Sequence, residues 1–224
     1  MIRGFALCLA LALGELGQAQ AQYGPSPYHA GPPDVRNPYD RARDGGNVDQ
    51  WTRLLDSADF RQRLRAVEDL GQSPDPRALN PLLKAVGDPD LRVEARAIDY
   101  LGARRASDAT PLLVQKLFLT GAPNALRQRV LTALGRIGDP SASRPILDFL
   151  GQEPSADVRG TGIYALGEIG DLTIREELRK LGDRESDPRL KQLVDEALMK
   201  IATLPRPEKK EFVPPSSGVV PPLK

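Results

Sequence analysis

The chain has 224 residues, enough for one domain or at most two, and aliphatic side chains carry its apolar content, with only 5% aromatic residues. Its 31 lysines and arginines balance 30 aspartates and glutamates, so no overall field would draw it to nucleic acid or to an anionic membrane surface. One histidine and one cysteine are too few for a zinc site built from those side chains, and we predict no metal, no cofactor and no catalytic residue.

Residues 1–22 have the pattern of a secretory signal peptide. A positive start at Arg3 precedes an apolar run over residues 4–13, and Ala19-Gln20-Ala21 forms a small-x-small cleavage site. The run is too short to span a membrane, which takes roughly 20 residues. We therefore predict cleavage near Ala21, export to the periplasm or the medium, no membrane insertion of the mature chain, and loss of the only cysteine, Cys8.

Low-complexity flanks lie on both sides of the remaining sequence. Residues 23–46 are rich in Pro, Gly and Tyr, and residues 203–224 are rich in Pro, so neither flank can bury a core. We expect a disordered linker and a disordered tail. They would serve either as docking peptides in polyproline form or as plain spacers. The only histidine, His29, lies in the first flank.

Between the flanks, residues 47–202 repeat a pattern of about 32 residues. A Leu-Gly step recurs at Leu70-Gly71, Leu101-Gly102, Leu134-Gly135 and Leu166-Gly167, with Leu198-Met199 as a degenerate fifth copy. An aliphatic residue three positions before each of the first four leucines lies on the same helical face. Each of the four steps leads through a polar turn to a second apolar segment, in three copies with a proline in its expected first helical turn.

Two helices in each period predict an all-α fold, a right-handed α-solenoid, because a single hairpin cannot bury both of its faces and needs a stacked neighbour. The pattern begins around Trp51 with what we predict to be a second helix lacking its first. It ends at residues 190–201 with a first helix lacking its second. We therefore expect about four full hairpins and a capping helix at each end.

The run from Asp157-Val158-Arg159 to Glu168-Ile169-Gly170-Asp171 resembles the HEAT-like repeats of the phycobilisome lyase family, over roughly residues 47–202. The resemblance implies a solenoid of HEAT-like hairpins and leaves function open. In the related deoxyhypusine hydroxylases such repeats bind iron through His-Glu pairs, which this sequence lacks. Phycobilin lyases act on tetrapyrroles inside the cell, and the predicted signal peptide argues against that role.

Arginine recurs seven positions before the leucine of the step. In similar repeats such arginines pair with turn aspartates of a neighbouring unit. We predict a structural ladder formed by Asp59, Arg63, Asp90, Arg127, Asp157 and Arg159. The alternative is a stripe of arginines that binds an anion or an acidic partner.

The second helices usually line the concave surface of such solenoids, where partners bind. The positions expected to point outward give a candidate partner-binding set: Asn80, Lys84, Val114, Phe118, Asp148 and Lys180. Val114 and Phe118 would place apolar surface within a polar row. Phe118 belongs to a stretch of extra length, residues 117–121, and turns either outward or into the local core.

These observations predict an exported, non-catalytic scaffold that binds a protein or peptide partner on its concave face. One alternative is an enzyme or chromophore-handling protein of the phycobilin lyase type. Another is a structural subunit of an envelope assembly with no separate ligand.

Overall fold

The computed structural model describes residues 47–203, and within this range all the regular elements are helices. The predicted signal peptide, the predicted linker over residues 23–46, and the predicted tail beyond residue 203 lie outside the described residues. None of the helices between residues 47 and 203 combines the length and the apolar character that crossing a bilayer requires.

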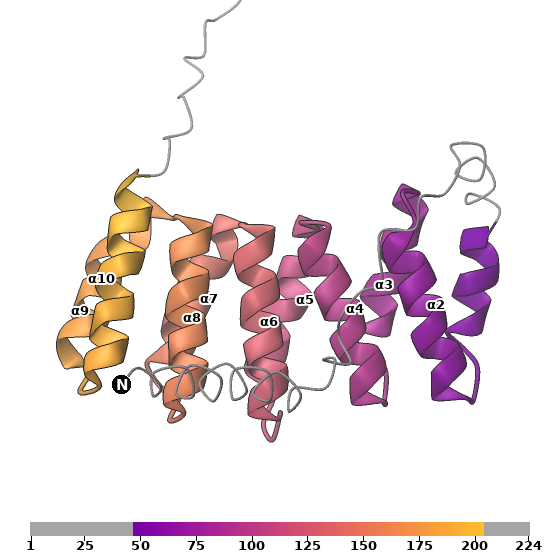
Figure 1. Ribbon diagram of the computed structural model, residues 1–224, viewed down its shortest axis with the longest axis horizontal. Coiled ribbons are helices and arrows are strands. Elements are labelled where there is room, and N and C mark those ends of the chain that lie inside the picture. Colours follow the sequence, from indigo (N-terminus) through magenta and orange to yellow (C-terminus); the bar gives the residue numbers. More distant parts are fainter. Residues whose placement is uncertain (1–46, 204–224) are drawn as a thin grey trace, which may run out of the picture. The chain divides into compact units, whose positions relative to one another are not determined.

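The helices alternate between longer first helices and shorter second helices, which Figure 1 shows as two layers of one row. A helix at residues 47–54 comes first. The first helices are α2 (Phe60–Gln72), α4 (Leu91–Ala103), α6 (Asn124–Ile137), α8 (Ala156–Ile169) and α10 (Pro188–Thr203). The second helices are α3 (Leu79–Ala85), α5 (Thr110–Leu117), α7 (Ser143–Leu150) and α9 (Arg175–Arg184). The predicted all-α solenoid, four hairpins between single capping helices, is confirmed.

Short 3-10 turns lead into the second helices: η1 (Pro76–Ala78), η2 (Ser107–Ala109), η3 (Pro140–Ala142) and η4 (Leu172–Ile174). An aspartate side chain accepts a backbone N–H at the start of three of them, as Asp139 does from Ser141 and Asp171 from Thr173. Such caps satisfy donors that a helix start leaves without a partner. The polar turns of the sequence therefore fix where each second helix begins.

The leucine of each of the four Leu-Gly steps is fully buried, and so are nearly all the residues three positions before it. The glycine that follows has a separate role. A Cβ built on Gly102 would lie 2.9 Å from Ala133 Cα, and one built on Gly135 would lie 3.0 Å from Ala165 Cα. Successive first helices therefore touch backbone to backbone, and their spacing depends on these glycines.

The second helices are not packed in this way. They have 7 to 10 residues, against 13 to 16 for the first helices. Each packs mainly on the first helix that follows it, and among them only α5 and α7 share more than isolated contacts in the described array. The closest packing of the solenoid thus lies on the side of the first helices.

Candidate functional site

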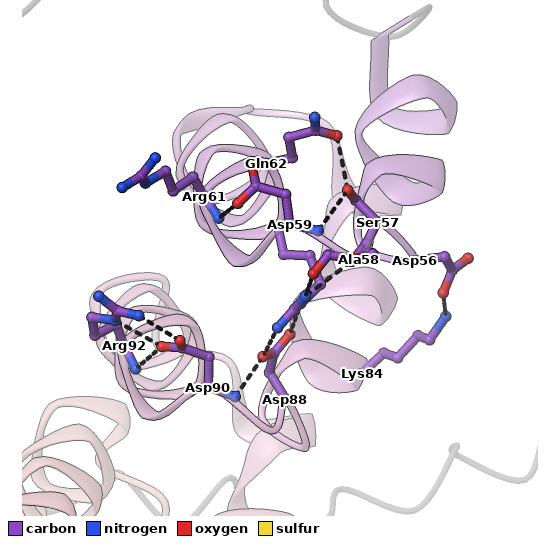
Figure 2. A network of polar contacts seen from close by, with 11 residues as sticks. Asp56, Ser57, Ala58, Asp59, Arg61, Gln62, Lys84, Asp88, Asp90 and Arg92 are labelled. Atoms are coloured by element: carbon purple, nitrogen blue, oxygen red, sulfur yellow. Dashed lines mark hydrogen bonds and ion pairs between the residues drawn. The ribbon is translucent and has the colours of Figure 1, made fainter.

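Arg63 on α2 joins the turn before α2 to the turn before α4, and Figure 2 labels the residues of these turns, among them Ser57, Asp88 and Asp90. Its Nε and Nη2 donate to Asp88 Oδ2 and Oδ1 at 2.7 and 2.9 Å, and its Nη1 donates to the carbonyl oxygen of Ser57 at 2.9 Å. Asp88 in turn accepts the backbone N–H of Asp90 at 2.8 Å. Because this bidentate pair is largely buried, Arg63 holds the turn before α2 against the turn before α4.

The same position on later first helices makes equivalent contacts. Arg159 donates to Glu185 at 2.9 and 3.1 Å, and Arg127 lies 3.2 Å from Glu153. In the second hairpin the polarity is reversed: Glu94 occupies the arginine position and accepts from Lys116 on α5 at 2.5 Å. Each hairpin therefore ties its first helix to its second helix, or to the turn after it, by a buried or half-buried charge pair.

The predicted ladder is wrong in its aspartates. Asp59 and Asp90 are the N-caps of α2 and α4, and each accepts the backbone N–H two residues ahead. Asp157 is exposed in the first turn of α8, whose N-cap is Ser155. The arginines pair instead with acids in the turn that follows the second helix of their own hairpin. The two helices of a hairpin run in opposite directions, so the start of the first helix lies beside the end of the second.

The pKa of Asp90 is lowered to about 2, chiefly because the side chain of Arg92 donates to it. The aspartate side chain of an unfolded chain has a pKa of about 3.9. The folded state therefore gains stability from the ionised carboxylate above about pH 4 and loses it as the pH falls toward 2. We expect Asp90→Asn, which keeps a capping oxygen, to flatten the dependence of melting temperature on pH in that window.

Arg92→Met should flatten the same dependence, since Arg92 is the main cause of the shift. Melting curves recorded at intervals between pH 2 and pH 5 measure the effect. An unchanged slope in both variants would contradict the assignment.

The predicted partner-binding residues differ in exposure. Asn80, Lys84, Asp148 and Lys180 are exposed, and they lie on the second helices α3, α7 and α9. Lys84 forms an ion pair with Asp56 at 2.6 Å, and Asp148 forms one with Arg144 on its own helix at 3.2 Å. Val114 is half-buried and packs against the core, contrary to its predicted exposure, because α5 turns that face toward its neighbours.

Phe118 is the exception in this set. It is 51% exposed, and the following Leu119 is 45% exposed. The Phe118 ring meets Phe149 edge to face, with 5.8 Å between ring centroids and an interplanar angle of 85°. In the other three hairpins, the turn after the second helix carries the acid that forms the ion pair with the arginine. In the second hairpin this turn begins with Phe118 and Leu119, and we call these two residues the Phe118 patch.

A hollow of about 300 Å³ lies across the carboxyl ends of α4, α6 and α8, and the sequence analysis did not identify it. It is lined by Gly102, Ala103, Arg105, Gly135, Arg136, Gly138 and Glu168. A second hollow, of about 370 Å³, adjoins the network of Figure 2. Its charged side chains, Asp56, Arg63, Lys84 and Asp88, are already ion-paired with one another.

Arg105 at the edge of the first hollow has an unusual backbone. Its φ is 52°, the left-handed region, and it is the only residue other than glycine with positive φ in the described part of the chain. The matching positions after α6 and α8 are Gly138 and Gly170, with φ of 74° and 73°. This conformation costs a residue with a side chain roughly 1 kcal/mol.

Glu168, which also lines that hollow, carries an ionised carboxylate. Its pKa is lowered, first because Lys200 donates to it and then because Tyr164 does. Within residues 47–203, no group of three His, Cys, Asp or Glu side chains is placed to hold a metal ion. The candidate surfaces of the molecule are thus the Phe118 patch and this hollow.

A family model described as HEAT repeats matches residues 48–120 and 116–199. The chain belongs to the HEAT repeat family. As a HEAT repeat protein it is 32% identical over 143 residues to the HEAT repeat-containing taxis protein of Halobacterium salinarum, and 29% identical over 73 residues to epoxyqueuosine reductase of Bacillus subtilis. These matches cover 55% and 33% of this chain, but only 35% and 19% of those two proteins.

Among solved structures, this HEAT repeat chain is similar to the complex of CpcE and CpcF of phycocyanin lyase from Nostoc sp. PCC7120. The TM-score is 0.48, with 22% sequence identity over 70% of this chain and 65% of that chain. The HEAT-like repeats inferred from the sequence are confirmed by the match to the HEAT repeat family.

Proposed function

We propose that this protein is an exported, non-catalytic scaffold that binds a protein or peptide partner, with the Phe118 patch as a contact surface. One observation carries the proposal: two large apolar side chains are exposed in a turn where the other hairpins carry a buried or half-buried ion pair. Exposed aromatic and aliphatic side chains that lie together are typical of protein contact sites.

The Phe118 ring is well suited to such a contact. Its edge-to-face packing on the buried Phe149 restricts its orientation before a partner arrives, which lowers the entropy cost of binding. Arg127, 5.8 Å from the Phe149 ring, adds a charge beside this aromatic pair. The solenoid supplies rigid support, since α5 packs on α6 and α7.

Affinity capture from the native cell envelope with the tagged intact protein tests this role. We expect partners captured by the wild type to fall at least about tenfold in yield with Phe118→Asp, because a charge would have to be desolvated in the contact. The matched control is Leu172→Asp, since Leu172 is also 45% exposed but lies in η4 at the opposite end of the helices.

Phe118→Ala separates a contact role from a core role. Because half of the ring is exposed, we expect it to lower the free energy of unfolding by only about 1 kcal/mol. A large drop in melting temperature with unchanged capture of partners would contradict a contact role for the Phe118 patch. Export is tested separately: sequencing the amino terminus of the protein recovered outside the cytoplasm should begin at Gln22.

A further inference from the structure

Two arginines line the hollow across α4, α6 and α8, and the charge of one of them, Arg105, helps to lower the pKa of Glu168. Arg105 and Arg136 are both exposed at its edge, and neither forms a hydrogen bond from its guanidinium or an ion pair within residues 47–203. This contrasts with Arg63, Arg127 and Arg159, which are all paired. Two guanidinium groups that line one hollow offer planar, forked donors to an anion.

Backbone strain supports a role for Arg105 beyond closing its helix. The turn after α4 has the hydrogen bonds of the turn that ends many helices, with Ala106 N–H donating to Leu101 O at 3.1 Å. Glycine suits the left-handed residue of this turn, and both Gly138 and Gly170 occupy the matching positions. An arginine at this position carries backbone strain that a glycine would not, which directs attention to its side chain.

The geometry points to a binding site in this hollow for an acidic segment of a protein partner, with a carboxylate held between Arg105 and Arg136. Gly102 and Gly135, which pack closely against Ala133 and Ala165 of the next first helix, form part of its lining. This inference rests on the proposed function, because it names the chemistry of a partner segment, and it uses a different surface from the Phe118 patch.

Glu168 favours a peptide carboxylate over inorganic phosphate as the anion bound in this hollow. It lines the same hollow, and its carboxylate, held ionised by Lys200, can accept a hydrogen bond from a ligand there. A peptide carries one negative charge on each carboxylate and N–H donors beside it, and Glu168 can accept one of those donors. The exposed Tyr164, hydrogen-bonded to Glu168, adds an aromatic surface along the same face.

Fluorescence anisotropy with the intact protein at low salt tests the site. The probe is a fluorescein-labelled Gly-Asp-Glu-Asp-Glu-Gly peptide, compared with its amide counterpart Gly-Asn-Gln-Asn-Gln-Gly. We expect the acidic peptide to bind and the amide peptide not to bind. Arg136→Ala and Arg105→Gly should each weaken binding about tenfold, the effect of one lost charge-assisted pair. Arg105→Gly should do so with an unchanged or higher melting temperature, because it relieves the strained backbone.

The control is Arg189→Ala, which removes an exposed arginine at the other end of the first helices. Equal weakening by Arg189→Ala would mean that only the general charge matters, and it would overturn the site. Equal binding of the amide peptide, or displacement by inorganic phosphate as readily as by the acidic peptide, would overturn the assignment to a carboxylate segment. Absence of binding to the wild type would refute this inference alone, provided that envelope capture still depends on Phe118.

Discussion

Replacing Gly102 by alanine is expected to lower the free energy of unfolding by about 2 kcal/mol, although alanine favours helix more than glycine does. The new Cβ would lie 2.9 Å from Ala133 Cα and 3.0 Å from Ala133 Cβ. These atoms belong to the backbone and the shortest side chain of the next first helix, so no rotamer change can make room. Helices α4 and α6 would have to separate, and the separation would disturb the stacking on both sides.

Urea unfolding followed by circular dichroism measures this effect, and Gly151→Ala is the matched control. A Cβ on Gly151 meets only main-chain oxygens of its own hairpin, at 3.6 Å or more, and its φ of −62° suits any residue. We expect the control to be neutral or to gain about 0.5 kcal/mol. If Gly102→Ala were as stable as the control, the spacing of the first helices would not depend on glycine.

The repeat pattern predicted the architecture well because burial leaves a periodic trace in the sequence. The leucine of each step and the aliphatic residue three positions earlier face the core, and any helix that buries one stripe must show that spacing. The same spacing places Gly162 four positions before Leu166, where an added Cβ would lie 2.5 Å from Leu150 Cδ2 on a second helix.

The partners of the arginines could not be predicted in the same way. The acids at 59, 88 and 90 lie close to one another at one end of the array, and sequence spacing does not say which of them Arg63 reaches. Asp59 and Asp90 already serve the N–H groups of their own helices, which leaves Asp88 for the guanidinium. An acid just after a second helix, read together with an N-cap residue two positions later, as in Asp88 with Asp90 and Glu153 with Ser155, would have been the useful signal.

The hollow beside Arg105 was missed for a different reason. Gly138, Gly170 and Arg105 each stand four positions after the leucine of the step, so the departure from glycine was present in the sequence. Its meaning depends on the left-handed backbone at that position, which the repeat pattern does not reveal. Surfaces formed across three helices depend on how the repeats stack, and a single repeat carries little trace of them.

Replacing Lys116 by methionine is expected to lower the free energy of unfolding by about 3 kcal/mol, since it leaves a buried carboxylate without its partner. The side chains of Glu94 and Lys116 are only 5% and 17% exposed, and Lys116 Nζ lies 2.5 Å from Glu94 Oε1. Methionine keeps the length and flexibility of the lysine stem, so the main change is the loss of the charge. Chemical denaturation near pH 7 measures the effect.

Adding Glu94→Leu to Lys116→Met should restore most of the lost stability, because an apolar pair of similar volume requires no desolvation of charge. The single variant Glu94→Leu strands a less buried ammonium group, which can turn toward solvent, and should therefore cost less than Lys116→Met. If the double variant were as unstable as Lys116→Met, the loss would come from the packing of the lysine stem rather than from the stranded carboxylate. Glu94 and Lys116 would then stabilise the second hairpin by the packing of their side chains, and not by the attraction between their charges.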